Sequence, residues 1–142
     1  GCRTPMPWDG KSKDMGFGSV VQKPWLPLTE AYRALAASEQ DTDPNSLLNF
    51  YRNLLAWRKG QEVLLQGDQA LLPVHKQVMA FVRQHEGKQV LCAFNFSDSA
   101  ANMALPANFK PAAIVPVPGL GGGSVLGDHI ELAAYGVLLL AL

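Results

Sequence analysis

The sequence predicts a mainly β fold, in which a long loop and one helix precede a series of antiparallel strands. Three observations support this prediction. Helical periodicity over residues 43–59 stops at Gly60, short apolar or alternating runs then recur at spacings of about 8–12 residues, and turn residues separate these runs. Short strands at such spacings are typical of an antiparallel sandwich or barrel.

Length, composition and charge exclude several classes of protein. The chain has 142 residues, of which 48% are hydrophobic, so it can form a buried core and is not expected to be disordered. Its 12 Lys+Arg balance its 12 Asp+Glu, and the basic residues do not cluster. This pattern argues against a nucleic-acid partner and against a polybasic membrane surface. No run approaches the roughly 18–20 apolar residues that span a bilayer.

The cysteines and histidines predict neither a disulfide framework nor a metal site. Cys2 and Cys92 are the only cysteines and lie far apart, and the three histidines show no ligand spacing. No metal and no cofactor are therefore expected. The cysteine usage suits a reducing compartment, so the expected location is cytoplasmic. Cys92 lies in the apolar run V-L-C-A-F and is expected to be an inert core residue.

Residues 1–28 predict a loop with a function. They begin G-C-R, with neither an initiator Met nor the basic and apolar regions of a signal peptide, so this start is expected to lie within a longer protein. Four prolines exclude a regular helix, yet the loop carries Trp8, Phe17 and Trp25. Long ordered loops with large aromatic side chains usually serve a function.

Residues 43–59 predict an amphipathic helix. Asp43 is a suitable N-cap, Pro44 fits the first helical position, and Gly60 follows two basic residues at the end. One face carries an apolar stripe made of Leu47, Leu48, Tyr51, Leu54 and Leu55. We expect other polypeptide to cover this stripe, because a soluble monomer rarely exposes several large apolar side chains together. Residues 30–40 are a candidate for a short helical turn.

The apolar runs after Gly60 predict strands. These runs are 63–65, 70–72, 78–83, 89–94, 101–105, 112–117, 129–132 and 136–142. Residues 85–88 contain a glycine and predict a hairpin loop. The glycine cluster 119–123 is expected to be a loop between strands, because no Lys follows it as in a phosphate-binding loop and no helix follows it as in a dinucleotide site.

Motifs for catalysis are not found in the chain. There is no G-x-S-x-G elbow for a nucleophile. None of the twelve carboxylates is placed as one of the pair that glycosidase chemistry needs, about 5–10 Å apart in a pocket. The N-x-S sequence at Asn95 is formally a glycosylation sequon, and we expect it to be a strand end.

Arg3 and the aromatic residues of the loop remain as a candidate site. An arginine with five donors beside exposed aromatic rings suits sugars, whose hydroxyls accept hydrogen bonds and whose faces stack on rings. A purely structural role, in which Arg3 and Trp8 buttress a proline-rich loop, explains the same residues equally well.

Three motifs resemble α-glucosidases of glycoside hydrolase family 13. They are R-T-P-M-P-W-D from Arg3, G-F-x(6)-P-W-L-P from Gly16, and D-P-N-S-L-L-N-F-Y-R-N-L-L-A-W-R from Asp43. The branch of oligo-1,6-glucosidases, dextran glucosidases and sucrose isomerases is the most similar. V-L-C-A-F-N-F-S from Val90 extends the resemblance into that family's C-terminal domain. Pro7 stands where the family usually has Gln.

This resemblance implies a C-terminal antiparallel β-sandwich preceded by the last loop and helix of a (β/α)8 TIM barrel. Residues 1–60 would be the end of the catalytic barrel, with the loop after strand 8 and helix 8, and residues 61–142 the C-terminal β-domain. The family's catalytic carboxylates lie upstream of Gly1, so no catalytic residue is expected here. Arg3 matches an arginine that contacts hydroxyls of the terminal glucose. Trp8 and Phe17 are expected to support the pocket.

The implied function is that of the C-terminal part of a retaining α-glucosidase, which hydrolyses terminal α-linked glucose from oligosaccharides. The expected partners are an α-glucoside oligosaccharide and the remainder of the barrel. Two alternatives stay open. One is a transglucosylase or sucrose isomerase of the same family, and the other is a stand-alone carbohydrate-binding or structural β-module.

Overall fold

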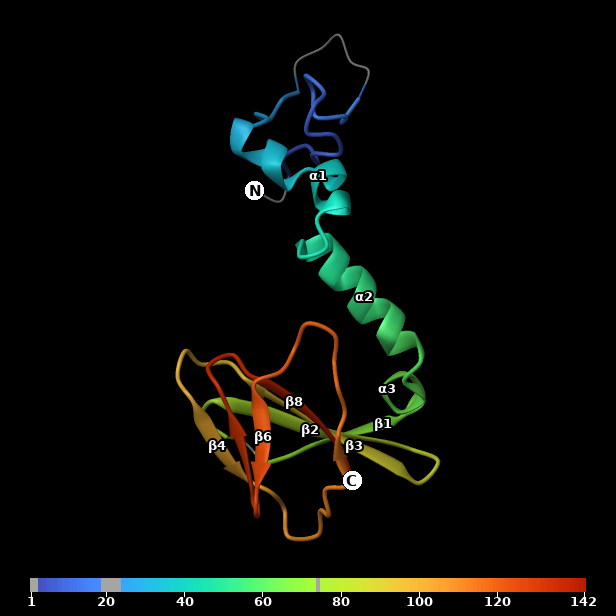
Figure 1. Ribbon diagram of the computed structural model, residues 1–142, viewed down its shortest axis with the longest axis vertical. Helices are drawn as coiled ribbons and strands as arrows, with labels where there is room; N and C mark the ends of the chain where they lie inside the picture. The colour runs from blue at the N-terminus through green and yellow to red at the C-terminus, as the bar shows by residue number, and fades with distance from the viewer. Residues whose placement is uncertain (1–2, 19–23, 74) are drawn as a thin grey trace. The chain divides into compact units, whose positions relative to one another are not determined.

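The computed structural model describes residues 3–18, 24–73 and 75–142. The chain forms two compact units, Gly1–Asn53 and Leu54–Leu142. The first unit holds irregular chain and helices, and the second holds the strands (Figure 1).

The first unit combines a long irregular segment with short helices. The 3-10 helix η1 (Glu30–Leu35) is followed by α1 (Ala37–Thr42) and by the beginning of α2 (Leu47–Lys59). The short helical turn expected over residues 30–40 is therefore present as two consecutive pieces. The buried residues of this unit include Pro5, Met15 and Ala36.

Helix α2 begins later than its sequence suggests. The prediction of Asp43 as N-cap is wrong, because its carboxylate accepts a hydrogen bond from the backbone N–H of Asn45 and closes a turn instead. Ser46 caps the helix, with its Oγ 3.2 Å from the backbone nitrogen of Asn49. The predicted end is confirmed, since α2 stops at Lys59 and the N–H of Gly60 closes the last turn onto the Trp57 carbonyl.

Much of the apolar stripe of α2 is exposed to solvent. None of the helix's residues is buried, and Leu47, Tyr51 and Leu55 are all exposed, while Leu48 and Leu54 are half-buried. The described part of the chain therefore covers this stripe only in part. That other polypeptide covers it stays a prediction.

The second unit begins with a helix that the sequence pattern does not reveal. The prediction of a strand over residues 63–65 is wrong, because α3 (Glu62–Gln66) occupies this run. Three consecutive apolar residues are too few to separate a helical from an extended period. Backbone hydrogen bonds from Leu64 and Leu65 to the Gln61 carbonyl start the turn.

The described residues after α3 form eight antiparallel strands in two sheets. The strands are β1 (Asp68–Leu71), β2 (Val78–His85), β3 (Lys88–Asn95), β4 (Ala101–Ala104), β5 (Ala113–Ile114), β6 (Gly123–Leu126), β7 (His129–Leu132) and β8 (Val137–Ala141). One sheet has the order β1-β2-β3-β8-β5 and the other β4-β7-β6 (Figure 1). The predicted hairpin is confirmed, with a two-residue turn at Glu86 and Gly87 in which both residues have positive φ, as a right-twisted hairpin requires.

The two sheets pack face to face, so the predicted antiparallel sandwich is confirmed. Alternate residues of β2, β3 and β8 point to the shared core, where they meet Ala101 and Met103 of β4 and Ile130 and Leu132 of β7. The sheets approach closely at Gly123 on β6. A Cβ added there would lie 2.6 Å from Cβ of Leu138 and 2.8 Å from Cδ2 of Leu132.

Candidate functional site

The loop at the start of the first unit carries the residues that the sequence nominated. Arg3 lies in a turn and is exposed. Trp8 is 54% exposed and Phe17 is 50% exposed, so both rings are available to a ligand or to another part of a larger protein. Among the described residues, no hydrogen bond joins Arg3 to either aromatic residue.

The backbone of the loop brings Gly16, the residue before Phe17, against Trp8. The N–H groups of Trp8 and Asp9 both donate to the Met15 carbonyl, at 2.8 and 2.9 Å. Met15 is 1% exposed and has φ of 55°, and Gly16 follows with φ of 70°. A Cβ at Gly16 would lie 3.3 Å from Cβ of Trp8, so only glycine allows this approach without strain.

The carboxylate of Asp9 closes the tip of the loop. It accepts hydrogen bonds from the hydroxyl of Ser12 and from the backbone N–H of Lys11. The Ser12 hydroxyl is the main cause that holds the pKa of Asp9 below its ordinary value, and the Lys11 amide adds to it. Asp9 is therefore a structural anion and not a proton donor at neutral pH.

The Trp8 segment is attached to α1 by its backbone. The N–H of Ala37 donates to the Pro7 carbonyl at 3.0 Å, and that of Ser38 donates to the Trp8 carbonyl at 2.9 Å. The hydroxyl of Ser38 accepts from the N–H of Gly10 at 3.1 Å. The first turn of α1 thus supplies donors that the helix itself cannot use, and the loop carbonyls accept them.

Two residues that hold this loop were missed by sequence reasoning. Met15 is the buried anchor, and an apolar residue among glycines, lysines and aspartates was a signal that could have found it. Arg33 donates to loop carbonyls more than twenty residues away in sequence, and a local sequence pattern cannot predict such a contact.

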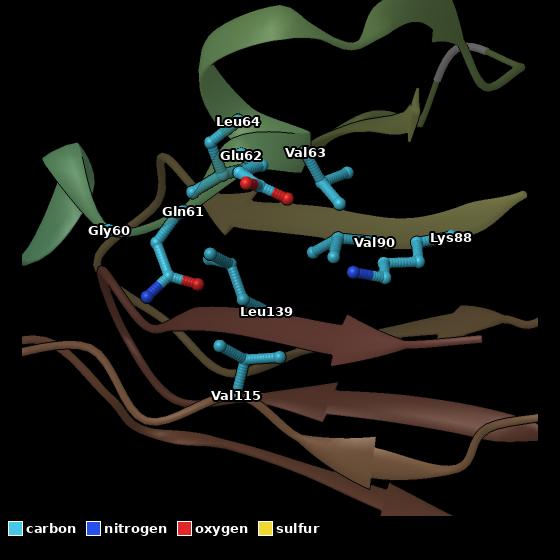
Figure 2. A pocket seen from close by; sticks show the side chains of 9 residues that line it. All are labelled: Gly60, Gln61, Glu62, Val63, Leu64, Lys88, Val90, Val115 and Leu139. Atoms are coloured by element: carbon cyan, nitrogen blue, oxygen red, sulfur yellow. The ribbon is translucent and has the colours of Figure 1, made fainter. Parts of the chain in front are cut away.

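A hollow of about 180 Å³ lies in the second unit, between α3 and the large sheet. Figure 2 shows the side chains that line it. Its lining is apolar at Val90, Val115 and Leu139 and at Val63 and Leu64 of α3. Polar groups come from Gln61, Glu62 and Lys88. Among the described residues, Glu62 is the one carboxylate that lines it. Glycoside hydrolysis uses two carboxyl groups, so this hollow is not suited to that chemistry.

Two further residues singled out from the sequence are structural. Cys92 is buried, and burial raises the pKa of its thiol to about 11, so the prediction of an inert core cysteine is confirmed. Asn95 is 3% exposed at the end of β3. Its Nδ2 already donates to the carbonyls of Ser99 and Ala133, so the predicted strand end is confirmed. Cys2 lies outside the described residues.

The described residues hold neither a metal-binding cluster nor a membrane-spanning helix. Within residues 3–18, 24–73 and 75–142, His, Cys, Asp and Glu side chains form no group of three that could hold a metal ion. In the same ranges, no helix has the length and apolar character needed to cross a bilayer.

Comparison with known proteins defines the class. Residues 1–67 match the family described as "Alpha amylase, catalytic domain", and residues 69–139 match "Maltogenic Amylase, C-terminal domain". These are an enzyme's catalytic domain and the β-rich domain that follows it. The chain belongs to glycoside hydrolase family 13, the α-amylase family.

Several relatives extend over most of the chain. A probable α-glucosidase of Rhizobium meliloti is 37% identical over 96% of this chain and 24% of its own length. An oligo-1,6-glucosidase of Saccharomyces cerevisiae is 32% identical over 75% of this chain and 19% of its own. The chain thus spans about a quarter or less of the length of these relatives.

Solved structures show the same similarity. The α-glucosyl transfer enzyme XgtA matches with a TM-score of 0.85 and 42% identity, over 99% of this chain and 25% of that one. The trehalulose synthase MutB from Pseudomonas mesoacidophila MX-45 matches with a TM-score of 0.76 and 26% identity, over 98% of this chain and 25% of that one.

Proposed function

We propose that this chain is the C-terminal part of a retaining α-glucosidase that hydrolyses terminal α-linked glucose from oligosaccharides. The observation that carries the proposal is the 37% identity to a probable α-glucosidase over 96% of the chain, which includes both the loop and the β-sandwich. The catalytic carboxylates belong to the part of the enzyme upstream of Gly1. The cysteine usage supports the cytoplasm as its location.

We assign residues 1–60 to the end of the catalytic barrel and residues 61–142 to the C-terminal β-domain. The family matches to residues 1–67 and 69–139 support a division into two such parts, with a boundary a few residues later in the sequence. They also weigh against a stand-alone β-module, because the first 67 residues resemble catalytic-domain sequence. The remainder of the barrel is the partner we propose for the open stripe of α2.

In this enzyme Arg3 binds hydroxyls of the terminal glucose, and Trp8 and Phe17 support the pocket. The exposure of all three side chains, the hydrogen bond from the Trp8 N–H to the Met15 carbonyl and the close approach of Gly16 to Trp8 support this role. A guanidinium presents donors in a planar fork, and hydrogen bonds from a charged group contribute about 1.5–3 kcal/mol each.

The test uses the full-length enzyme that contains these residues, with p-nitrophenyl α-glucoside and isomaltose as substrates. We expect release of glucose that is first formed as the α-anomer, which proton NMR detects. Arg3→Ala should lower kcat/KM by about ten- to a hundred-fold, and Arg3→Lys should not restore it. Arg52→Ala is the control, because Arg52 lies on α2 and pairs with Asp41. Release of the β-anomer, or no release at all, would contradict the proposal.

Transfer of the glucosyl group to a sugar acceptor is a second candidate. It is favoured by the 42% identity to an α-glucosyl transfer enzyme, which is higher than the identity to the probable α-glucosidase. Both reactions pass through the same covalent glycosyl-enzyme, and water or a sugar then accepts the glucosyl group. Product analysis with maltose as both donor and acceptor separates them. Hydrolysis of one maltose gives two molecules of glucose, whereas transfer between two maltose molecules gives one trisaccharide and one glucose.

A further inference from the structure

Arg33 of η1 binds the backbone of the loop that carries Trp8 and Phe17. Its Nη1 lies 2.9 Å from the Gly10 carbonyl oxygen and 2.6 Å from that of Ser12. Its Nη2 lies 3.5 Å from the Lys13 carbonyl oxygen, a longer contact. One guanidinium thus faces three carbonyl groups of the same bend, and its side chain is 30% exposed.

Glu30 holds this guanidinium in place from the other side. Its Oε2 accepts from Nε of Arg33 at 2.7 Å, and its Oε1 lies 3.4 Å from Nη2. The Arg33 hydrogen bond holds the pKa of Glu30 below its ordinary value. The Glu30 carboxylate therefore holds one edge of the Arg33 guanidinium, while another edge donates to the loop carbonyls.

The bend at residues 10–13 is also linked by hydrogen bonds to the segments on either side of it, which carry Trp8 and Phe17. Asp9 closes the bend through Lys11 and Ser12, and the neighbouring amides of Trp8 and Asp9 bind the Met15 carbonyl. A shift of the carbonyls at Gly10 and Ser12 therefore changes the backbone on which Trp8 and Phe17 sit. Within residues 3–18, Pro5 and Met15 are the buried residues, so polar contacts contribute much of the order of this segment.

We propose that Arg33 is a positioning residue for the sugar site: by binding the carbonyls of Gly10, Ser12 and Lys13 it fixes the loop on which Trp8 and Phe17 are displayed. This role rests on the proposed function, because it requires that the loop lines a glucose pocket. Arg33 itself touches no substrate. Without Arg33 the loop is less ordered, and part of the substrate-binding free energy is then used to order it.

The kinetic test compares Arg33→Gln with the wild-type full-length enzyme on p-nitrophenyl α-glucoside. We expect KM to rise by about 5- to 20-fold while kcat changes by less than about two-fold. The free energy needed to order the loop weakens binding of the substrate and of the transition state by the same amount. Arg33→Lys should recover much of the loss, since an ammonium group has enough donors for the Gly10 and Ser12 carbonyls. If Arg33 only stabilised the fold, its replacement would lower the melting temperature and would not raise KM at nearly constant kcat.

Arg52→Gln is the matched control. Arg52 is an arginine of the same unit that also pairs with a carboxylate, Asp41, but its remaining hydrogen bond goes to the side chain of Asn49 and not to the loop. It should keep wild-type KM and kcat. Far-UV circular dichroism and the melting temperature establish that each variant is folded.

Limited proteolysis gives a readout of the loop that is independent of activity. Lys11 and Lys13 are exposed, and the bend held by Arg33 contains the peptide bonds that follow them. Trypsin should cut after Lys11 or Lys13 at least about ten-fold faster in Arg33→Gln than in Arg52→Gln, as mass spectrometry of the fragments shows.

The outcomes separate the two proposals. Unchanged KM in a folded Arg33→Gln variant of an active enzyme would overturn the positioning role alone. Unchanged cleavage after Lys11 and Lys13 would overturn it as well. A folded wild-type enzyme without activity on α-glucosides would overturn the proposed function and the positioning role together.

Discussion

At the scale of single residues, two carboxylates stabilise the same loop. Asp9 accepts hydrogen bonds within it, and Glu30 binds Arg33, which donates to its carbonyls. The Ser12 hydroxyl and the Lys11 amide lower the pKa of Asp9, and Arg33 lowers the pKa of Glu30. A carboxylate whose pKa is lower in the folded state stabilises that state above its ordinary pKa, and this stabilisation is lost as the pH falls through the lowered value. The loop should therefore loosen in acid.

Hydrogen exchange of the loop amides tests this pH dependence. Between about pH 6 and about pH 3, exchange over residues 8–17 should accelerate beyond the intrinsic pH effect, while exchange in β3 should not. The double variant Asp9→Asn, Glu30→Gln should remove most of the acid-dependent part. An equal acceleration in β3 would mean that the whole fold, and not the loop, responds to acid.

Cys92 gives a second prediction at this scale. Because burial raises the pKa of its thiol to about 11, Cys92 should react with a thiol reagent only when the second unit opens. In a Cys2→Ser variant, about one thiol should react after urea unfolding and almost none before it. Rapid reaction in the native state would show that the β2–β3 face opens easily.

At the scale of elements, Asn95 joins the end of β3 to two turns. Its Nδ2 donates to the carbonyls of Ser99 and Ala133 at 2.7 and 2.8 Å, and its Oδ1 accepts from the N–H and the hydroxyl of Ser97. Ala133 belongs to the turn between β7 and β8, so one side chain ties both sheets at this end of the sandwich.

Replacing Asn95 by Ala should lower the free energy of unfolding by about 2–3 kcal/mol, because a buried residue loses its hydrogen bonds to Ser97, Ser99 and Ala133. Urea unfolding followed by circular dichroism measures this loss. Asn102→Ala, at an exposed position of β4, is the matched control and should change stability by less than about 0.5 kcal/mol. Equal losses of stability in both variants would show that the hydrogen bonds of Asn95 stabilise the fold no more than an exposed asparagine does.

The elements also show what the sequence could predict. Long segments were predictable, since the stripe of α2 and the alternation of β2 repeat often enough to define one period, and β3 contains a continuous apolar run. The start of α2 and the identity of α3 were not, because Ser46 competes with Asp43 as a cap and the run 63–65 is too short to show a period. In the site, Arg3, Trp8 and Phe17 could be nominated from local sequence. Arg33 could not, because its contacts with Gly10 and Ser12 depend on tertiary folding.

At the scale of the whole molecule, the proposed function makes a direct prediction for these 142 residues alone. Without the upstream carboxylates, neither nucleophilic attack nor proton donation is available. The purified chain should release no p-nitrophenol from p-nitrophenyl α-glucoside above the rate in buffer. Activity that co-purifies with the chain through several columns would contradict the assignment of the catalytic groups to the upstream part.

The place of β8 in the large sheet sets the order in which the sandwich can be completed. Strand β8 lies between β3 and β5, although it is the last strand in the sequence. During synthesis β2 and β3 can pair as a hairpin early, but β5 has no neighbour in its sheet until residues 137–141 have left the ribosome. Nascent chains that stop short of these residues would lack Leu138 and Leu140 of the core and would leave the edge of β3 unpaired, so we expect them to aggregate more readily than chains that contain β8.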